Sequence, residues 1–209
     1  MLSNQKTNDT VQGSILGLPL GGKKSGIAQA FTSLVSATLP ELTSSQLLYS
    51  YGIEPSTEDD EAFEKVLQFA GDVSFYAPTL AFAQGMEKAM PVYVYRFNEP
   101  NDWPGPWKGR STHIHDLTYL LQNFNDHLSD EQSSLAEEFA ANVTAFANGQ
   151  EPWQRWNKDQ KSAKVFEVGG EGVKEDVAED TGRRGIVVHL ADEVGFDALK
   201  AAFVRFMIS

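Results

Sequence analysis

One short segment limits the folds open to this chain. Residues 91–97, PVYVYRF, are β-branched or aromatic at almost every position, and polar side chains do not alternate with apolar ones. An apolar run of this length predicts a strand covered on both faces, as in a sheet with helices on either side. Segments with the apolar spacing of helices lie before and after it in the sequence. The sequence therefore favours an α/β fold.

The expected helices have recognisable ends. A helix within residues 56–72 is predicted to be capped by Ser56 or Thr57, with Glu58, Asp59 and Asp60 complementing its dipole. A later helix is predicted to begin after Ser129, with Gly149 beyond its end. Helices are also expected at residues 27–39, 41–51, 73–89 and 193–207 and in a short segment after His113, and strands at residues 163–168 and 185–190.

Composition narrows the range of partners. The 209 residues carry a net charge of −12 and are 41% hydrophobic, which is typical of a globular chain of one or two domains. Nucleic acids and anionic membranes bind basic surfaces, so the charge argues against both. The absence of cysteine excludes disulfides and cysteine-ligated zinc. No apolar run reaches the roughly 18 residues of a membrane span, and the polar start lacks the apolar core of a secretory signal.

Two further motifs could indicate a nucleotide site and a metal site, but each has a simpler structural interpretation. Residues 17–23 fit the G-x-x-x-x-G-K pattern of a phosphate-binding loop, but Lys24 stands where a Ser or Thr must reach magnesium. A surface loop is the better interpretation. His113 and His115 would share a face if they lay on a strand, and could then ligate zinc. Because the spacing singles out no further ligand, we expect neither a metal nor a cofactor.

The order of several segments resembles the type-B carboxylesterase/lipase family, the cholinesterase-like branch of the α/β-hydrolases. The segments are GDVSFYAPTLAFAQGM, VYVYRFNEP, WPGPWKGRSTH, HIHDLTYLLQNFNDHLS and, at the far end, RRGIVVHLADEVGFDALKAAFVRFM. The fourth is similar to the family's His-x-x-(Asp/Glu)-(Leu/Ile) segment, especially in its fungal form. The resemblance spans most of the chain from about residue 31 and implies that the last segment forms a closing strand followed by a helix.

The resemblance also implies catalytic residues. His113 matches the catalytic histidine, which agrees with its position in a loop after a buried strand. Asp116 can serve the N-terminus of the following helix, whereas Ile114 departs from the small residue that many relatives carry. The acid of the triad is Asp9, or its position is occupied by Gln12, which could hydrogen-bond an imidazole but could not stabilise imidazolium. His115 is expected to be a bystander.

The nucleophile is missing from this sequence. Hydrolases of this fold order their triad as serine, acid and histidine, with the serine in a G-x-S-x-G motif, and no such motif occurs in the chain. The resemblance therefore implies that residues 1–209 are the C-terminal part of a single α/β-hydrolase domain, with Met1 an internal or mis-assigned start. Strand 91–97 would then present an unpaired edge.

Two functions follow from these residues. In the first, the chain is the C-terminal segment of a serine esterase whose substrate is a carboxylic ester, with residues 103–107 lining the acyl or alcohol pocket. In the second, it is a non-catalytic remnant or interaction module, because without a serine it cannot transfer an acyl group by this mechanism. Members of the family are often secreted, but this chain shows no signal peptide, so its compartment stays open.

Overall fold

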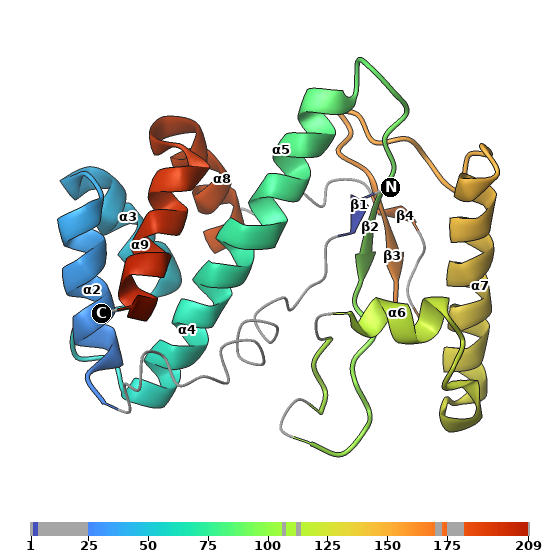
Figure 1. Ribbon diagram of the computed structural model, residues 1–209, viewed down its shortest axis with the longest axis horizontal. Helices are drawn as coiled ribbons and strands as arrows, with labels where there is room; N and C mark the ends of the chain where they lie inside the picture. The colour runs from blue at the N-terminus through green and yellow to red at the C-terminus, as the bar shows by residue number, and fades with distance from the viewer. Residues whose placement is uncertain are drawn as a thin grey trace. The chain divides into compact units, whose positions relative to one another are not determined.

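The computed structural model describes residues 2–3, 25–105, 108–111, 114–169, 173–174 and 182–208. The chain divides into two compact units. One unit, which contains the sheet, comprises Met1–Thr7 and Thr79–Ala178, and the other, which is helical, comprises Asn8–Pro78 and Glu179–Ser209. Each is described below by itself (Figure 1).

The helical unit is built from segments near both ends of the chain. Phe31 lies at the centre of its core and packs edge-on against Phe69 and Phe206, with ring centroids 5.7 and 5.2 Å apart. The expected helices at residues 27–39 and 41–51 are confirmed, as are those within residues 56–72 and 193–207. The elements are α2 (Ile27–Thr38), α3 (Glu41–Tyr51), α4 (Asp59–Gly71), a π-helical turn (Asp72–Tyr76), α8 (Arg183–Val194) and α9 (Phe196–Ile208).

The expected strand at residues 185–190 is wrong, because this segment lies in α8. The buried residues of α8 include Val187, Leu190 and Ala191, which follow the i, i+3, i+4 spacing of a helix that buries one face. A run of six residues with three consecutive apolar side chains fits a strand and a buried helical segment equally well. Packing against neighbouring helices determines that this segment forms a helix and not a strand.

The start of α4 is capped differently from the prediction. Glu58 is the N-cap residue, and its side chain makes no capping hydrogen bond. Thr57 instead accepts a hydrogen bond from the backbone N–H of Glu54. The predicted acidic first turn is confirmed, but the carboxylate of Asp59 accepts from the backbone N–H groups of Gly26 and Ile27 at 3.1 and 2.9 Å. Asp59 therefore caps α2 rather than its own helix.

The second unit contains a four-stranded sheet in the order β1-β2-β3-β4. The pairs β1–β2 and β2–β3 are parallel, and β4 runs antiparallel to β3. The predicted strands within residues 91–97 and 163–168 are confirmed. The elements are β1 (Leu2–Ser3), α5 (Ala77–Met86, in this unit from Thr79 onward), β2 (Val94–Phe97), α6 (His115–Leu120), α7 (Asp130–Ala147), β3 (Ala163–Phe166) and β4 (Val173–Lys174).

The expected unpaired edge at residues 91–97 is wrong. Tyr95 in β2 pairs with Ser3 on one side and with Lys164 on the other, so β2 has a parallel neighbour along each side. Both neighbours come from distant parts of the chain. Their pairing satisfies backbone groups that an open edge would leave exposed.

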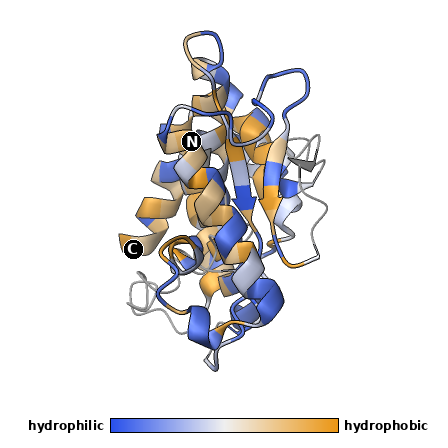
Figure 2. Ribbon diagram, turned by 90° about the vertical axis from the view of Figure 1, so that its right-hand side faces the viewer, coloured by the Kyte–Doolittle hydropathy of each residue, from blue (hydrophilic) through white to orange (hydrophobic). Residues whose placement is uncertain are grey.

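Aromatic side chains form the core beside the sheet. Phe139 of α7 packs against Phe97 and Phe166, with ring centroids 5.6 and 4.7 Å apart, and α7 lies along the sheet in Figure 1. The predicted cap of α7 is confirmed: Ser129 Oγ accepts from the backbone N–H of Gln132 at 3.2 Å. The helices carry both hydrophobic and hydrophilic residues, as expected when one side packs inward (Figure 2).

Candidate functional site

The candidate site lies in the sheet unit, where the chain leaves β2 and enters α6. Ser111 is buried, and its hydroxyl donates to the backbone carbonyl of Phe97 at 3.0 Å, which fastens the loop to the end of the strand. Residues 112 and 113 follow and lie outside the described ranges. The predicted catalytic residue His113 is thus outside the described residues. Asp9 and Gln12, the two candidates for the position of the acid, also lie outside them.

Ile114 opens α6 in a backbone conformation that isoleucine rarely adopts. Its φ is 56° and its ψ is 10°, the left-handed region, which costs a non-glycine residue on the order of 1–2 kcal/mol. Its side chain is 55% exposed. Strain of this kind is retained where the surrounding structure requires it, and such positions cluster at functional sites.

His115, the first residue of α6, is buried among aromatic rings. Its exposed fraction is 5%, and its ring centroid lies 5.8 Å from those of Phe97 and Trp103 and 5.4 Å from that of Tyr119. Its ring is hydrogen-bonded to the backbone of Pro100, which can only accept. Nε2 has no hydrogen-bond partner among the described residues, so Nδ1–H is the donor to Pro100.

The environment of His115 favours the neutral ring. Burial lowers the pKa of His115, since it penalises the charged imidazolium. The hydrogen bond to Pro100 and the charges of Glu99 and Asp102 oppose this effect without overcoming it. With Nδ1 protonated and directed to Pro100, Nε2 of the neutral ring is a hydrogen-bond acceptor.

An amide joins two acidic side chains beside this histidine. Gln132 Nε2 donates to Glu99 Oε1 at 3.0 Å and to Asp102 Oδ2 at 2.8 Å. The other oxygen of Glu99 accepts from the backbone N–H of Val168 at 2.7 Å. Sequence reasoning missed this arrangement. The Ser129-x-x-Gln132 spacing is a capping-box signal, but nothing in the sequence indicates that Gln132 also reaches Glu99 and Asp102.

The carboxylate of Asp116 accepts a hydrogen bond from a backbone N–H in the first turn of α6, as predicted. Its Oδ1 accepts from the backbone N–H of Leu117 at 3.0 Å, and its Oδ2 accepts from the hydroxyl of Tyr95 at 2.9 Å. The second bond ties α6 to β2. Asp116 therefore fixes the orientation of the helix that follows position 113.

Two adjoining cavities share Trp103 and His115. The larger is an open groove of about 330 Å³ along α6 and the turn that follows it, and the smaller, of about 130 Å³, lies on the side of α7. The groove is lined by Asn101, Trp103, Ile114, His115, Leu117, Thr118, Leu121, Asn123 and Phe124, and the smaller cavity by Asp102, Trp103, His115, Tyr119, His127, Leu128 and Gln132.

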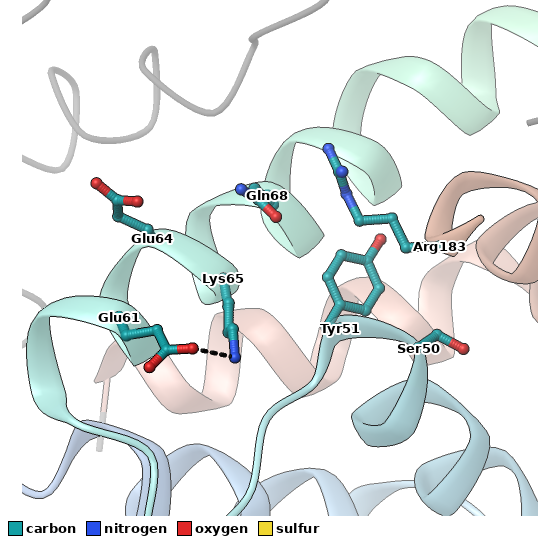
Figure 3. A pocket seen from close by; sticks show the side chains of 7 residues that line it. All are labelled: Ser50, Tyr51, Glu61, Glu64, Lys65, Gln68 and Arg183. Carbon is teal, nitrogen blue, oxygen red and sulfur yellow. Dashed lines mark ion pairs between the residues drawn. The ribbon is translucent and has the colours of Figure 1, made fainter.

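A separate pocket of about 360 Å³ lies in the helical unit (Figure 3). Lys65 forms an ion pair with Glu61 at its rim, and Tyr51 and Arg183 extend toward one another across it. Both of these contact the buried Asp72: the Tyr51 hydroxyl donates at 2.9 Å and Arg183 Nε at 3.0 Å. Burial raises the pKa of Tyr51, and the negative charge of Asp72 adds to the effect. These contacts fix α3 and α8 to the π-helical turn.

Within the described ranges, no group of three or more histidine and acidic side chains is arranged to hold a metal ion. No helix among the described residues has both the length and the apolar character that crossing a membrane requires.

The comparison with protein families decides the assignment of the chain. The model of the carboxylesterase family matches residues 23–181. The chain belongs to the carboxylesterase family. This confirms the resemblance inferred from the order of its segments, and the matched range includes the loop from β2 to α6. A search of curated protein sequences found no match.

Solved esterase structures share the fold of this carboxylesterase-family chain. A juvenile hormone esterase from Manduca sexta, with OTFP covalently attached, is 16% identical with a TM-score of 0.63, and the match covers 92% of this chain and 40% of that one. A pNB esterase is 15% identical with a TM-score of 0.58, covering 76% and 32%. The chain thus spans well under half the length of these structures. The fold is a partial α/β-hydrolase fold, as the sequence predicted.

Proposed function

We propose that this chain is the C-terminal part of a single α/β-hydrolase domain in an enzyme that hydrolyses carboxylic esters through an acyl-serine intermediate. The family match over residues 23–181 carries the proposal. In the proposed mechanism, His113 takes the proton of the serine as it attacks the ester carbonyl, gives it to the departing alcohol, and then activates the water that releases the acid.

The surroundings of position 113 support this assignment. Ser111, two residues earlier, is hydrogen-bonded to the end of β2, and Asp116, three residues later, is hydrogen-bonded to Tyr95 in the same strand. A catalytic base needs a fixed position relative to its nucleophile, and loops anchored on strands commonly supply one. Asp9 is the proposed acid that orients the imidazole and stabilises its charged form.

The serine must come from outside these 209 residues, since no G-x-S-x-G motif occurs among them. We therefore expect the chain alone to be inactive toward esters. The test begins with the native protein from its source, whose intact mass and peptide map will show whether a segment with that motif precedes residue 1.

In a protein with the nucleophile present, His113→Ala is expected to lower kcat for a small carboxylic ester by about 10³-fold or more, because loss of one triad member disables the acyl-transfer unit. His189→Ala is the matched control: this histidine lies on α8 and is 62% exposed. An unchanged kcat in the His113→Ala protein would show that His113 is not the base.

The absence of the serine motif favours a second candidate function, that of a non-catalytic remnant or interaction module. A native mass of 23.0 kDa without additional peptides, together with no ester hydrolysis, would support this candidate and contradict the first.

A further inference from the structure

The pocket of the helical unit contains an arginine that is held through one nitrogen and open at the others. Arg183, the first residue of α8, donates through Nε to Asp72 at 3.0 Å, and its side chain is 30% exposed. Asp72 is buried, and its oxygens also accept from the Tyr51 hydroxyl at 2.9 Å and from Arg184 Nε at 2.8 Å. The terminal nitrogens of Arg183 make no hydrogen bond within the part of the chain that the structure describes.

This anchoring prepares the guanidinium of Arg183 for a ligand. A flexible arginine side chain loses rotamer freedom when a ligand fixes it, whereas Arg183 is already fixed through Nε. The planar fork of terminal N–H groups matches the two oxygens of a carboxylate. Because Arg183 lines the pocket of about 360 Å³ (Figure 3), a carboxylate that enters the pocket can reach this fork.

A second polar side chain lines the same pocket and has no partner among the described residues. The amide of Gln68, on α4, is half-buried and makes no hydrogen bond there, so its N–H₂ group can donate to a ligand oxygen. The lysine beside it is already engaged. Lys65 is paired with Glu61 at 2.6 Å and donates to the backbone carbonyl of Gly52 at 2.6 Å. Arg183 and Gln68 are therefore the donors that the pocket offers to an acceptor.

The acidic residues of the pocket limit the charge of its ligand. Glu61 and Glu64 line it, and Asp72 lies against Arg183. A phosphate dianion would bring a second negative charge close to these carboxylates, and like charges repel. A neutral amide has nearly the shape of a carboxylate but lacks the charge that strengthens a hydrogen bond to arginine. The pocket therefore favours a single carboxylate over both.

We propose that this pocket binds a small monocarboxylic acid. Its carboxylate accepts from the terminal N–H groups of Arg183, and the amide of Gln68 is a second donor. The carboxylate can belong to a free acid or to the C-terminus of a polypeptide, since both present the same group. The site uses none of the residues proposed for catalysis, so it is independent of the proposed function.

Binding to the full 209-residue chain can be measured by NMR titration of the amide signals of Gln68 and Arg183. Butanoate and butanamide are nearly equal in size and differ in charge, inorganic phosphate at pH 8 is mainly a dianion, and N-acetylglycylglycine ends in a peptide carboxylate. We expect butanoate to bind about tenfold more tightly than butanamide or phosphate, the effect of charge-assisted hydrogen bonds from one arginine. N-acetylglycylglycine that binds at least as tightly as butanoate would assign the site to a polypeptide C-terminus, and weaker binding would assign it to a free acid.

Three results would overturn the proposal. Equal affinities for butanoate and butanamide would show that the charge is not recognised. Tightest binding of phosphate would show that the acidic residues do not limit the charge of the ligand. No shift of the Gln68 and Arg183 signals with any of these compounds would show that the pocket binds no carboxylate.

Variants separate the site from a general attraction of anions. Arg183→Gln removes the fork and is expected to weaken butanoate about tenfold or more. Arg205→Gln is the matched control, because it removes the same charge from an exposed position on α9 outside the pocket, and its affinity should stay within about twofold. An equal loss in both variants would overturn the proposal.

A second variant leaves the contacts of Asp72 intact, in case Arg183→Gln does not fold. Gln68→Glu adds a negative charge at the pocket, and is expected to weaken butanoate about tenfold while leaving butanamide within about twofold. Unchanged binding of butanoate to Gln68→Glu would contradict the placement of the carboxylate beside this residue.

Discussion

At the scale of single residues, burial changes the behaviour of one histidine. His115 sits two positions from His113 in a loop of polar residues, and the sequence predicted that it is a bystander. The structure buries it against three aromatic rings and lowers its pKa. Composition could not reveal this, because the rings that cover it come from β2, from the loop after it and from the next turn of α6.

The lowered pKa of His115 predicts a pH-dependent stability. The unfolded chain has a histidine pKa of about 6.5, so below that pH the unfolded state binds a proton that the folded state resists. The contribution of His115 is therefore fully present above about pH 6.5 and is lost as the pH falls through the lowered folded value. Urea unfolding from pH 8 to pH 5 should show a steeper loss of stability for the natural chain than for His115→Phe. Parallel curves would show that His115 titrates normally.

At the scale of elements, the helices with clear periodicity were predictable and their caps only in part. The cap of α7 is local, because Ser129 and Gln132 lie within one turn. The cap of α2 is not: Asp59 reaches Gly26 and Ile27 across more than thirty residues. An acidic residue at a helix start is assigned to its own helix from sequence alone, and only packing shows that it serves a neighbour. The same limit explains the strand wrongly expected within α8.

The cap of α2 can be tested with two adjacent residues. Asp59→Ala is expected to lower the free energy of unfolding by about 1 kcal/mol, the usual effect of losing a side-chain cap. Asp60→Ala is the matched control, because both residues lie in the first turn of α4 and complement its dipole, but only Asp59 is hydrogen-bonded to α2. Chemical denaturation of both proteins should separate them, and equal losses would mean that the dipole of α4 explains the effect.

At the scale of the whole molecule, each unit joins segments that are distant in sequence. In one, β2 pairs with the first residues of the chain and with β3. In the other, helices from both ends of the chain pack around Phe31. Strand 91–97 was expected at an edge because the family resemblance implied that most strands of the sheet lie outside this chain, and periodicity predicts an element but not its neighbours. Its true neighbours include a two-residue strand, too short to carry a period.

The buried carboxylate of Asp72 illustrates this long-range organisation. It is 1% exposed and accepts hydrogen bonds from the Tyr51 hydroxyl at 2.9 Å, Arg183 Nε at 3.0 Å and Arg184 Nε at 2.8 Å. Arg184 is itself buried and lies over the ring of Tyr76, 4.7 Å from its centroid. A single negative charge thus holds two cations that are more than a hundred residues away in sequence.

Neutralising that carboxylate should destabilise the helical unit. Asp72→Asn keeps the shape but removes the negative charge that is ion-paired with the buried Arg184, and removing one partner of a buried ion pair costs about 3 kcal/mol or more. Asp192→Asn is the control: it removes the same charge from an exposed position on α8 and should change stability by less than about 0.5 kcal/mol. Urea unfolding followed by far-UV circular dichroism measures both. A loss for Asp72→Asn no larger than for the control would mean that the two arginines are satisfied without Asp72, and that α3, the π-helical turn and α8 are held together by their apolar contacts alone.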